Sequence, residues 1–233
     1  MNPELVLLHG FTQTRQSWRR TIQALAGRYR AITPDLPGHG QAVHRTASFD
    51  ACAAYIRALQ PRVLGGYSMG GRIALYAALT VPGIERLVLV GASPGIADPA
   101  ERAARRAADE ALAARIETMS IEEFAREWGS QPLFAGQPER VAAAAYADRL
   151  RNTPAGLAAA LRGLGTGVME PLWERLGELT MPVTLITGER DEKFRAIAEA
   201  MLARLPDARH VIVPGAGHAP QLEAPDLVAA AIR

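Results

Sequence analysis

The chain has 233 residues, of which 48% are hydrophobic and 21% charged, the composition of one globular domain large enough to bury a core. The formal net charge is only +2 and no basic stripe is present, so we expect no nucleic-acid partner. No apolar stretch reaches the length of a membrane span, and Cys52 is the single cysteine, which indicates a cytoplasmic protein without a membrane span or an internal disulfide.

The first predicted strand covers residues 5 to 8 and begins so early that we expect no signal peptide before it. It runs into His9-Gly10-Phe11, a sharp turn out of a buried strand. The backbone N–H of Phe11 is therefore a candidate donor to an oxyanion that develops during a reaction. His9 and His39 both lie in loop motifs, and we expect them to brace those loops rather than to react.

A G-x-S-x-G motif occupies Gly66-Tyr-Ser-Met-Gly70, between an apolar run and a helix predicted from residue 71 to 79. A serine at the apex of a strand, a sharp turn and a helix is typical of a nucleophile elbow, whose strained turn needs glycines. Ser68 is therefore the candidate nucleophile or base. The N–H of Met69, at the positive end of the following helix, is the second candidate for the oxyanion hole.

Arg72 lies four residues after Ser68 on that predicted helix. Positions i and i+4 share a helix face and helical side chains lean toward the N-terminus, so its guanidinium should point back toward Ser68. A buried guanidinium is costly without an anionic partner. Two partners are open at this point: Asp35 or another core carboxylate in a salt bridge, or a substrate carboxylate held beside Ser68.

The strand pattern stops between residues 97 and 170, where the chain is alanine-rich and helical. Ser120-Ile-Glu-Glu123 is a capping box, and Thr153-Pro154 places a cap residue before a proline suited to the first helical position. We expect a helical cap of about four short helices over the active site, inserted into a single domain. The two flanking segments, 1–96 and 171–233, would form the core.

Two further candidates each follow a predicted strand near the C-terminus. Asp191 is the expected orienting acid, with Glu189 and Glu192 as weaker candidates, and His218 is the expected base. A serine hydroxyl reacts at neutral pH only when a base takes its proton. The order Ser68, Asp191, His218 is the order of the catalytic triad in α/β hydrolases.

Strand-length apolar runs alternate with helix-length segments along most of the chain, which predicts a mostly parallel sheet with helices on both faces. Ligands in such α/β folds bind beyond the carboxyl ends of the strands, where the oxyanion-hole and triad candidates all fall. No metal-ligand spacing and no phosphate-loop ending occurs, so we expect no cofactor. The runs cover residues 5 to 8, 30 to 33, 62 to 65, 86 to 91, 182 to 187 and 210 to 213.

Several motifs together resemble one known family, the 2-succinyl-6-hydroxy-2,4-cyclohexadiene-1-carboxylate synthases of menaquinone biosynthesis. The resemblance covers nearly the whole chain, and its cap motifs are more specific than the triad. The motifs are Gly66-Tyr-Ser-Met-Gly-Gly-Arg72, Ser93-Pro-Gly95, Trp128 before Gln131-Pro-Leu-Phe134, Arg149 ahead of Gly156-Leu-Ala158 and Leu161-Arg-Gly163, and Gly188-Glu-Arg-Asp-Glu-Lys-Phe194.

The resemblance implies an α/β-hydrolase fold that acts as a carbon–oxygen lyase without a cofactor. The enzyme would eliminate pyruvate from 2-succinyl-5-enolpyruvyl-6-hydroxy-3-cyclohexene-1-carboxylate, a small molecule with three carboxylates, by proton abstraction through the triad. It further implies that arginines bind these carboxylates and that two aromatic residues shape the pocket. The substrate-binding residues implied are Arg72, Arg105 (with Arg102 and Arg106 as alternatives in register), Arg149, Tyr67 and Trp128.

Other functions use the same triad. A serine carboxylesterase or thioesterase would form an acyl-enzyme that water attacks, and would have an apolar acyl pocket in place of positioned arginines. A carbon–carbon bond hydrolase of related fold is closer in chemistry. A catalytically dead ligand receptor is a further alternative, although such proteins usually lack a triad member and this chain lacks none.

Overall fold

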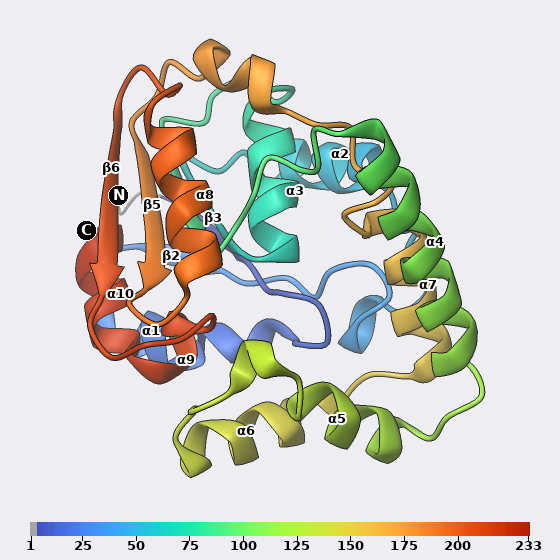
Figure 1. Ribbon diagram of the computed structural model, residues 1–233. Helices are drawn as coiled ribbons and strands as arrows, with labels where there is room; N and C mark the ends of the chain where they lie inside the picture. Colours follow the sequence, from blue (N-terminus) through green and yellow to red (C-terminus); the bar gives the residue numbers. More distant parts are fainter. Residues whose placement is uncertain (1–3) are drawn as a thin grey trace.

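The structure is a computed structural model that describes residues 4–233. Its centre is a parallel sheet with the strand order β2-β1-β3-β4-β5-β6, so the chain moves outward from β1 in both directions (Figure 1). Neighbouring strands within residues 4–233 all pair in parallel, which confirms the predicted parallel sheet. The strands are β1 (Glu4–Leu8), β2 (Arg30–Ile32), β3 (Val63–Tyr67), β4 (Arg86–Val90), β5 (Val183–Gly188) and β6 (Ala208–Val213).

Helices cover both faces of the sheet because the central strands are apolar on both sides. Leu64 and Leu87 of neighbouring strands pack with helices α2, α3 and α8 on one face, whereas Leu5 and Val88 pack with α10 on the other. The core helices are α1 (Arg19–Ala24), α2 (Phe49–Leu59), α3 (Met69–Ala78), α8 (Glu192–Leu202), α9 (Pro220–Glu223) and α10 (Pro225–Ile232). Short 3₁₀ helices are η1 (Arg15–Trp18), η2 (Gly40–Ala42), η3 (Pro132–Phe134) and η4 (Trp173–Glu178).

The segment between β4 and β5 is helical, as the sequence predicted. Its helices are α4 (Pro99–Ile116), α5 (Ile121–Gly129), α6 (Glu139–Arg149) and α7 (Pro154–Leu164). The capping box at Ser120 and Glu123 is present, and Thr153 caps α7, so both predicted helix starts are confirmed. The expected helices were short, but α4 runs for 18 residues because Asp98 caps it and an alanine-rich sequence continues it without a break.

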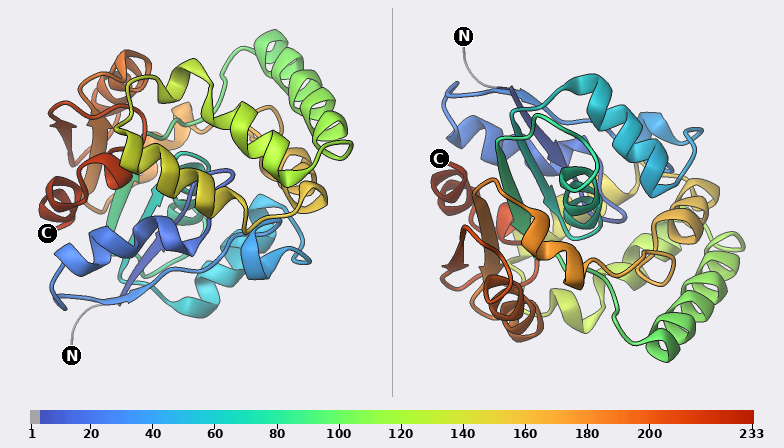
Figure 2. Two further views of the ribbon diagram at one scale, coloured as in Figure 1. Left: turned by 90° about the horizontal axis from the view of Figure 1, so that it is seen from below. Right: turned by 90° about the horizontal axis from the view of Figure 1, so that it is seen from above.

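Helices α5 and α6 lie beyond the carboxyl ends of the strands. The arrowheads of β5 and β6 point toward the side of the molecule where α5 and α6 lie (Figure 1), and α6 lies in front of the sheet when it is seen from below (Figure 2). Helix α4 packs on α7 at the periphery of the molecule.

The division of the chain into a core (1–96 and 171–233) and a cap (97–170) stays a prediction. No helix among residues 4–233 is long and apolar enough to cross a membrane.

Candidate active site

Ser68 stands at the tight turn between β3 and α3. Its backbone has φ 49° and ψ −110°, a conformation that a residue with a side chain rarely adopts. The turn is possible because its flanking glycines have no Cβ. A Cβ at Gly66 would overlap the backbone of Gly70, and one at Gly70 would overlap the carbonyls of Leu8 and His9. The motif therefore presents the Ser68 hydroxyl at the carboxyl edge of the sheet.

The structure brings Ser68, His218 and Asp191 together from three strand ends. His218 Nδ1 lies 2.6 Å from Asp191 Oδ2, and His218 Nε2 lies 3.5 Å from Ser68 Oγ. The second distance is at the long end for a hydrogen bond, as is common for catalytic pairs before a substrate tightens them. Both Asp191 and His218 are buried. Glu189 instead accepts a bond from the N–H of Gly215, and Glu192 is exposed.

The two candidate oxyanion donors face the same cavity as Ser68. Phe11 lies in the turn after β1, and Met69 is the first residue of α3, where helical N–H groups have no partner within the helix. In the part of the chain that the structure describes, neither N–H donates a hydrogen bond. Both donors are therefore free to bind a developing negative charge.

His9 and His39 hold the loops around these donors, which confirms the structural role expected for them. His9 Nε2 accepts from the N–H of Leu36 at 2.9 Å, and His39 Nε2 accepts from the N–H of Thr12 at 3.2 Å. Burial lowers the pKa of His9 to about 4, and burial together with the charge of His9 lowers that of His39 to about 3. Both are therefore neutral at physiological pH, as an acceptor nitrogen requires.

A cavity of about 230 Å³ lies over the Ser68 hydroxyl. Its wall combines Ser68 and His218 of the candidate triad and the two oxyanion residues with side chains of α4, α5 and α7. This is the position in which an α/β fold binds its ligands. The lining includes Phe11, Ser68, Met69, Arg72, Ser93, Arg105, Asp109, Leu112, Trp128, Gln131, Leu161, Leu164, Lys193, Phe194 and His218.

Arg72 is buried at this cavity and has no ion pair within residues 4–233. Its Nη1 donates to the carbonyl of Leu164 at 2.9 Å. Asp35 does not neutralise it, because the Asp35 oxygens accept from the N–H groups of Arg15 and Gln41. Burial and then the charge of Arg105 lower the pKa of Arg72 to about 10, although the charge of Asp109 raises it. Arg72 therefore stays charged at neutral pH without a bonded anion.

Arg149 is a second buried guanidinium without an ion pair among the described residues. Only 5% of the residue is exposed, its Nε has no hydrogen-bond partner, and its guanidinium lies 5.4 Å from the ring centroid of Phe134. Burial lowers its pKa, and the nearby Tyr67 and Asp148 raise it. Arg151, two residues later, is instead exposed beside Asp148. Arg149 lies outside the wall of the cavity over Ser68, on the Tyr67 side.

Tyr67 and Trp128 occupy different places. Tyr67 is buried behind the triad, with its ring centroid 5.3 Å from that of His218, and it does not line the cavity. Burial raises its pKa above the usual range, Asp191 adds to this, and Arg149 opposes it. Trp128 does line the cavity and also packs on Phe11, with ring centroids 5.1 Å apart. Trp128 therefore both lines the cavity and packs in the apolar cluster formed by the helices between β4 and β5.

Of Arg102, Arg105 and Arg106, Arg105 lines the cavity, and its role in binding substrate stays a prediction. Arg102 pairs with Glu170 at 2.9 Å, and Arg106 does not line this wall. Arg105 is not a free cation, however, because its Nε donates to Asp109 Oδ1 at 2.8 Å and its side chain is 46% exposed. Its charge is thus partly neutralised before any ligand arrives.

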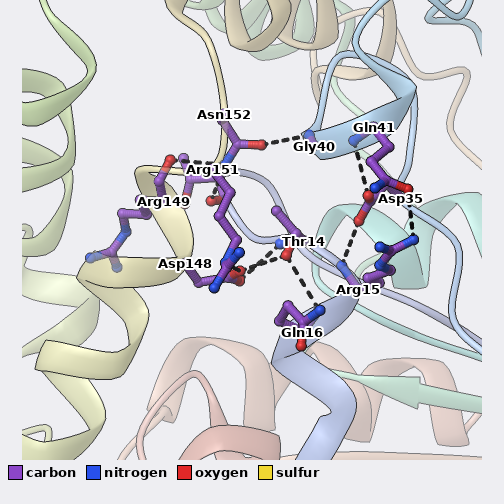
Figure 3. Close-up of polar contacts among 11 residues, drawn as sticks. Thr14, Arg15, Gln16, Asp35, Gly40, Gln41, Asp148, Arg149, Arg151 and Asn152 are labelled. Atoms are coloured by element: carbon purple, nitrogen blue, oxygen red, sulfur yellow. Dashed lines mark hydrogen bonds and ion pairs between the residues drawn. The ribbon is translucent and has the colours of Figure 1, made fainter.

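The end of α6 is tied to the loop that carries Phe11 (Figure 3). Asp148 accepts from the N–H of Thr14 at 2.9 Å and from its hydroxyl at 2.5 Å. Asn152 donates to the carbonyls of Thr12 and Arg149, and accepts from the N–H of Gly40. The Arg149 side chain points away from these bonds (Figure 3). Asp148 and Asn152, on either side of Arg149 in the sequence, therefore hold the backbone at Arg149 against the loops after β1 and β2.

The sequence interpretation missed Asp109 and the contact between Thr14 and Asp148. Arg105 and Asp109 stand four residues apart on one helix, a spacing at which opposite charges pair, so this signal was readable. The contact between Thr14 and Asp148 joins residues 134 positions apart, so no local sequence pattern predicts it. Nowhere in residues 4–233 do three His, Cys, Asp or Glu side chains gather in a way that could hold a metal ion.

Comparison with known proteins places the chain in a family. The α/β hydrolase family matches residues 5–231. The 2-succinyl-6-hydroxy-2,4-cyclohexadiene-1-carboxylate synthase of Salmonella typhimurium is 35% identical and covers 96% of this chain and 89% of its own length. The structure of MenH from S. aureus matches with a TM-score of 0.94 at 35% identity, over 100% of this chain and 92% of that one.

A thermophilic esterase from Thermogutta terrifontis, solved with malate bound, is more distant. It is 28% identical with a TM-score of 0.81, over 99% of this chain and 88% of its own. The chain is more similar to the two synthases than to this esterase, both in sequence identity and in structure. The chain therefore belongs to the α/β hydrolase family and, within it, to the 2-succinyl-6-hydroxy-2,4-cyclohexadiene-1-carboxylate synthases.

Proposed function

We propose that the protein eliminates pyruvate from 2-succinyl-5-enolpyruvyl-6-hydroxy-3-cyclohexene-1-carboxylate to give 2-succinyl-6-hydroxy-2,4-cyclohexadiene-1-carboxylate. The relatives named for this product cover nearly the whole chain. The observation that carries the proposal is the pair of buried arginines near the triad, Arg72 and Arg149, which have no ion pair of their own among residues 4–233. Such groups are stable when a ligand supplies anions.

The first step is removal of the ring proton next to the succinyl ketone. Ser68 Oγ would take this proton while His218 Nε2 takes the proton of the hydroxyl. Asp191, 2.6 Å from His218 Nδ1, fixes the ring and stabilises its charged form. The electrons of the broken C–H bond pass to the ketone oxygen, so the substrate becomes an enolate.

The enolate oxygen is the charge that the N–H groups of Phe11 and Met69 would bind. As the carbonyl re-forms, the enolate electrons form a double bond between ring carbons 2 and 3, the electrons of the original double bond move to carbons 4 and 5, and the bond from carbon 5 to the enolpyruvyl oxygen breaks. The leaving group departs as the enolate of pyruvate and takes up a proton to become pyruvate. No water enters the bond that breaks, so the reaction is an elimination and not a hydrolysis.

The arginines give the pocket its preference for a substrate with several carboxylates. Arg72 and Arg105 line the cavity beside Ser68, whereas Arg149 lies outside its wall near Tyr67, so in this proposal the substrate extends toward Arg149. Planar guanidinium groups bind carboxylates through two parallel hydrogen bonds, which fixes orientation as well as charge. In this proposal Trp128 shapes the wall opposite, and Tyr67 supports His218.

An esterase is the second candidate, because the same triad and free N–H donors are suited to acyl transfer and an esterase shares the fold. Incubating the purified protein with the cyclohexene tricarboxylate separates the two. We expect stoichiometric release of pyruvate, measured with lactate dehydrogenase and NADH, together with the absorbance of the conjugated diene. An enzyme that hydrolyses simple esters but releases no pyruvate would refute the synthase assignment.

Activity is expected without a metal or organic cofactor, since the oxyanion donors supply the electrophile. Dialysis against EDTA should therefore leave the rate of pyruvate release unchanged. The measurement is the initial rate before and after dialysis, with buffer-dialysed enzyme as the control. A loss of activity that a divalent cation restores would show that a metal takes part.

The cytoplasmic location expected from the sequence stays a prediction.

A further inference from the structure

Asp109 is a buried carboxylate at the active-site cavity. It lies on α4 and only 6% of the residue is exposed. Its Oδ1 accepts from Arg105 Nε at 2.8 Å, while its Oδ2 is buried with no hydrogen-bond partner among the described residues. The Oδ2 atom lies against Gly165, where an added Cβ would stand 2.6 Å from it. A carboxylate oxygen without a donor is costly inside a protein, so a nearby positive charge must compensate it.

The compensating charges are the two arginines of the same wall. Arg72 donates to the carbonyl of Leu164, and Asp109 Oδ2 lies against the next residue, Gly165, so both charged groups lie at the end of α7 without forming an ion pair. The charge of Asp109 raises the pKa of Arg72, whereas that of Arg105 lowers it. Two positive charges and one negative charge therefore share this part of the cavity before any ligand binds.

We propose that Asp109 is an internal counter-charge that substitutes for a ligand carboxylate in the empty cavity and so sets the selectivity of the arginines. The proposal deepens the proposed function and rests on it. Because Oδ2 is buried, Asp109 acts on a ligand through its charge and through Arg105, as a positioning and selectivity residue. It stabilises Arg72 and Arg105 when the cavity is empty, and it repels each carboxylate that enters.

The consequence is weak binding of common small carboxylates. A ligand with one or two carboxylates gains the attraction of Arg72 and Arg105 but also meets the repulsion of Asp109. Under the proposed function the third carboxylate of a tricarboxylate binds Arg149, which lies outside the wall of this cavity and has no ion pair within residues 4–233, and this contact offsets the repulsion. The buried negative charge would thereby favour the substrate over abundant metabolites with fewer charges.

The test is Asp109→Asn, which keeps the size of the side chain and an oxygen that Arg105 Nε can bond, but removes the charge. Succinate is the probe, and its Kd is measured by isothermal titration calorimetry. We expect the variant to bind succinate roughly tenfold more tightly, as the loss of one partly screened charge a few ångströms away would give. Asp109→Ser, which is also neutral, should show the same direction and repeats the test if the first variant does not fold.

The matched control is Glu101→Gln, which removes the same charge from the exposed face of the same helix. It should change the Kd by less than about twofold, because solvent screens a surface charge. Unchanged or weaker succinate binding in the folded Asp109 variants would overturn the inference, and so would the absence of succinate binding in wild type and variants alike.

Failure of this inference can be told apart from failure of the proposed function. Wild-type enzyme that releases pyruvate, with Asp109 variants that bind succinate no more tightly, would refute the counter-charge alone. Tighter succinate binding in the variants, with no pyruvate released by wild type, would support the counter-charge and refute the synthase assignment.

Discussion

Ser68→Ala is expected to lower the rate of pyruvate release by ~10³-fold or more, the largest effect of any single change proposed. The reason is that, among residues 4–233, Ser68 supplies the hydroxyl that lies within 3.5 Å of His218 Nε2. Ser68 is held there by a backbone conformation that the two motif glycines permit. The measurement is kcat for pyruvate release, with circular dichroism to verify that the variant folds.

Ser130→Ala serves as the control, because Ser130 is exposed at the end of α5 and should not affect the rate. A Ser68→Ala enzyme that keeps nearly wild-type pyruvate release would remove the hydroxyl from the mechanism. If His218→Ala were inactive at the same time, His218 would be the direct base, and the elbow would serve only to present the N–H of Met69.

Arg72→Ala and Arg149→Ala are each expected to lower kcat/KM for the tricarboxylate by roughly 10- to 150-fold. A charge-assisted hydrogen bond contributes about 1.5 to 3 kcal/mol, which corresponds to this range. Hydrolysis of the neutral ester p-nitrophenyl acetate, if the triad supports it, should change little because that ester has no carboxylate. The measured quantity is the ratio of the two activities in the same variant.

Arg105→Ala should lower kcat/KM for the tricarboxylate less than these two variants do, since Arg105 is half-exposed and already paired with Asp109.

Arg151→Ala is the matched control for Arg149→Ala. The two residues stand two positions apart, but the Arg151 side chain is 60% exposed and lies beside Asp148. It should therefore leave both activities unchanged. Equal loss of lyase and esterase activity in the Arg72 and Arg149 variants would show that the arginines are structural, and the esterase assignment would gain.

Local sequence predicted elements that hold triad residues and a helix start between β4 and β5. The G-x-S-x-G turn, the capping box at Ser120 and the strand before Asp191 each depend on neighbouring residues, whose propensities and steric limits act over a few positions. The length of α4 was predicted wrongly. Short helices were expected, although the sequence contains no cap residue or glycine that would end this helix before Ile116.

The charge balance of the cavity could not be predicted in the same way. In the sequence, the resemblance implied three carboxylate-binding arginines, and a salt bridge between Arg72 and a core carboxylate stayed open. In the structure Arg72 and Arg149 are buried without an ion pair within residues 4–233, while Arg105 is paired. Whether an arginine is free depends on which carboxylate lies within about 4 Å of it, and that is decided by how α4 packs on α7 and how α6 meets the core.

The sequence by itself determined the parallel α/β fold, the elbow at Ser68 and the order of Ser68, Asp191 and His218, because turn sterics, strand patterning and motif spacing are local properties. Only the tertiary structure decided that Asp109 shares the cavity with Arg72, and that Asp148 and Thr14, 134 positions apart, tie the cap to the loop of Phe11. Burial and long-range contacts set the energies of these charges, and they exist only once the chain has packed.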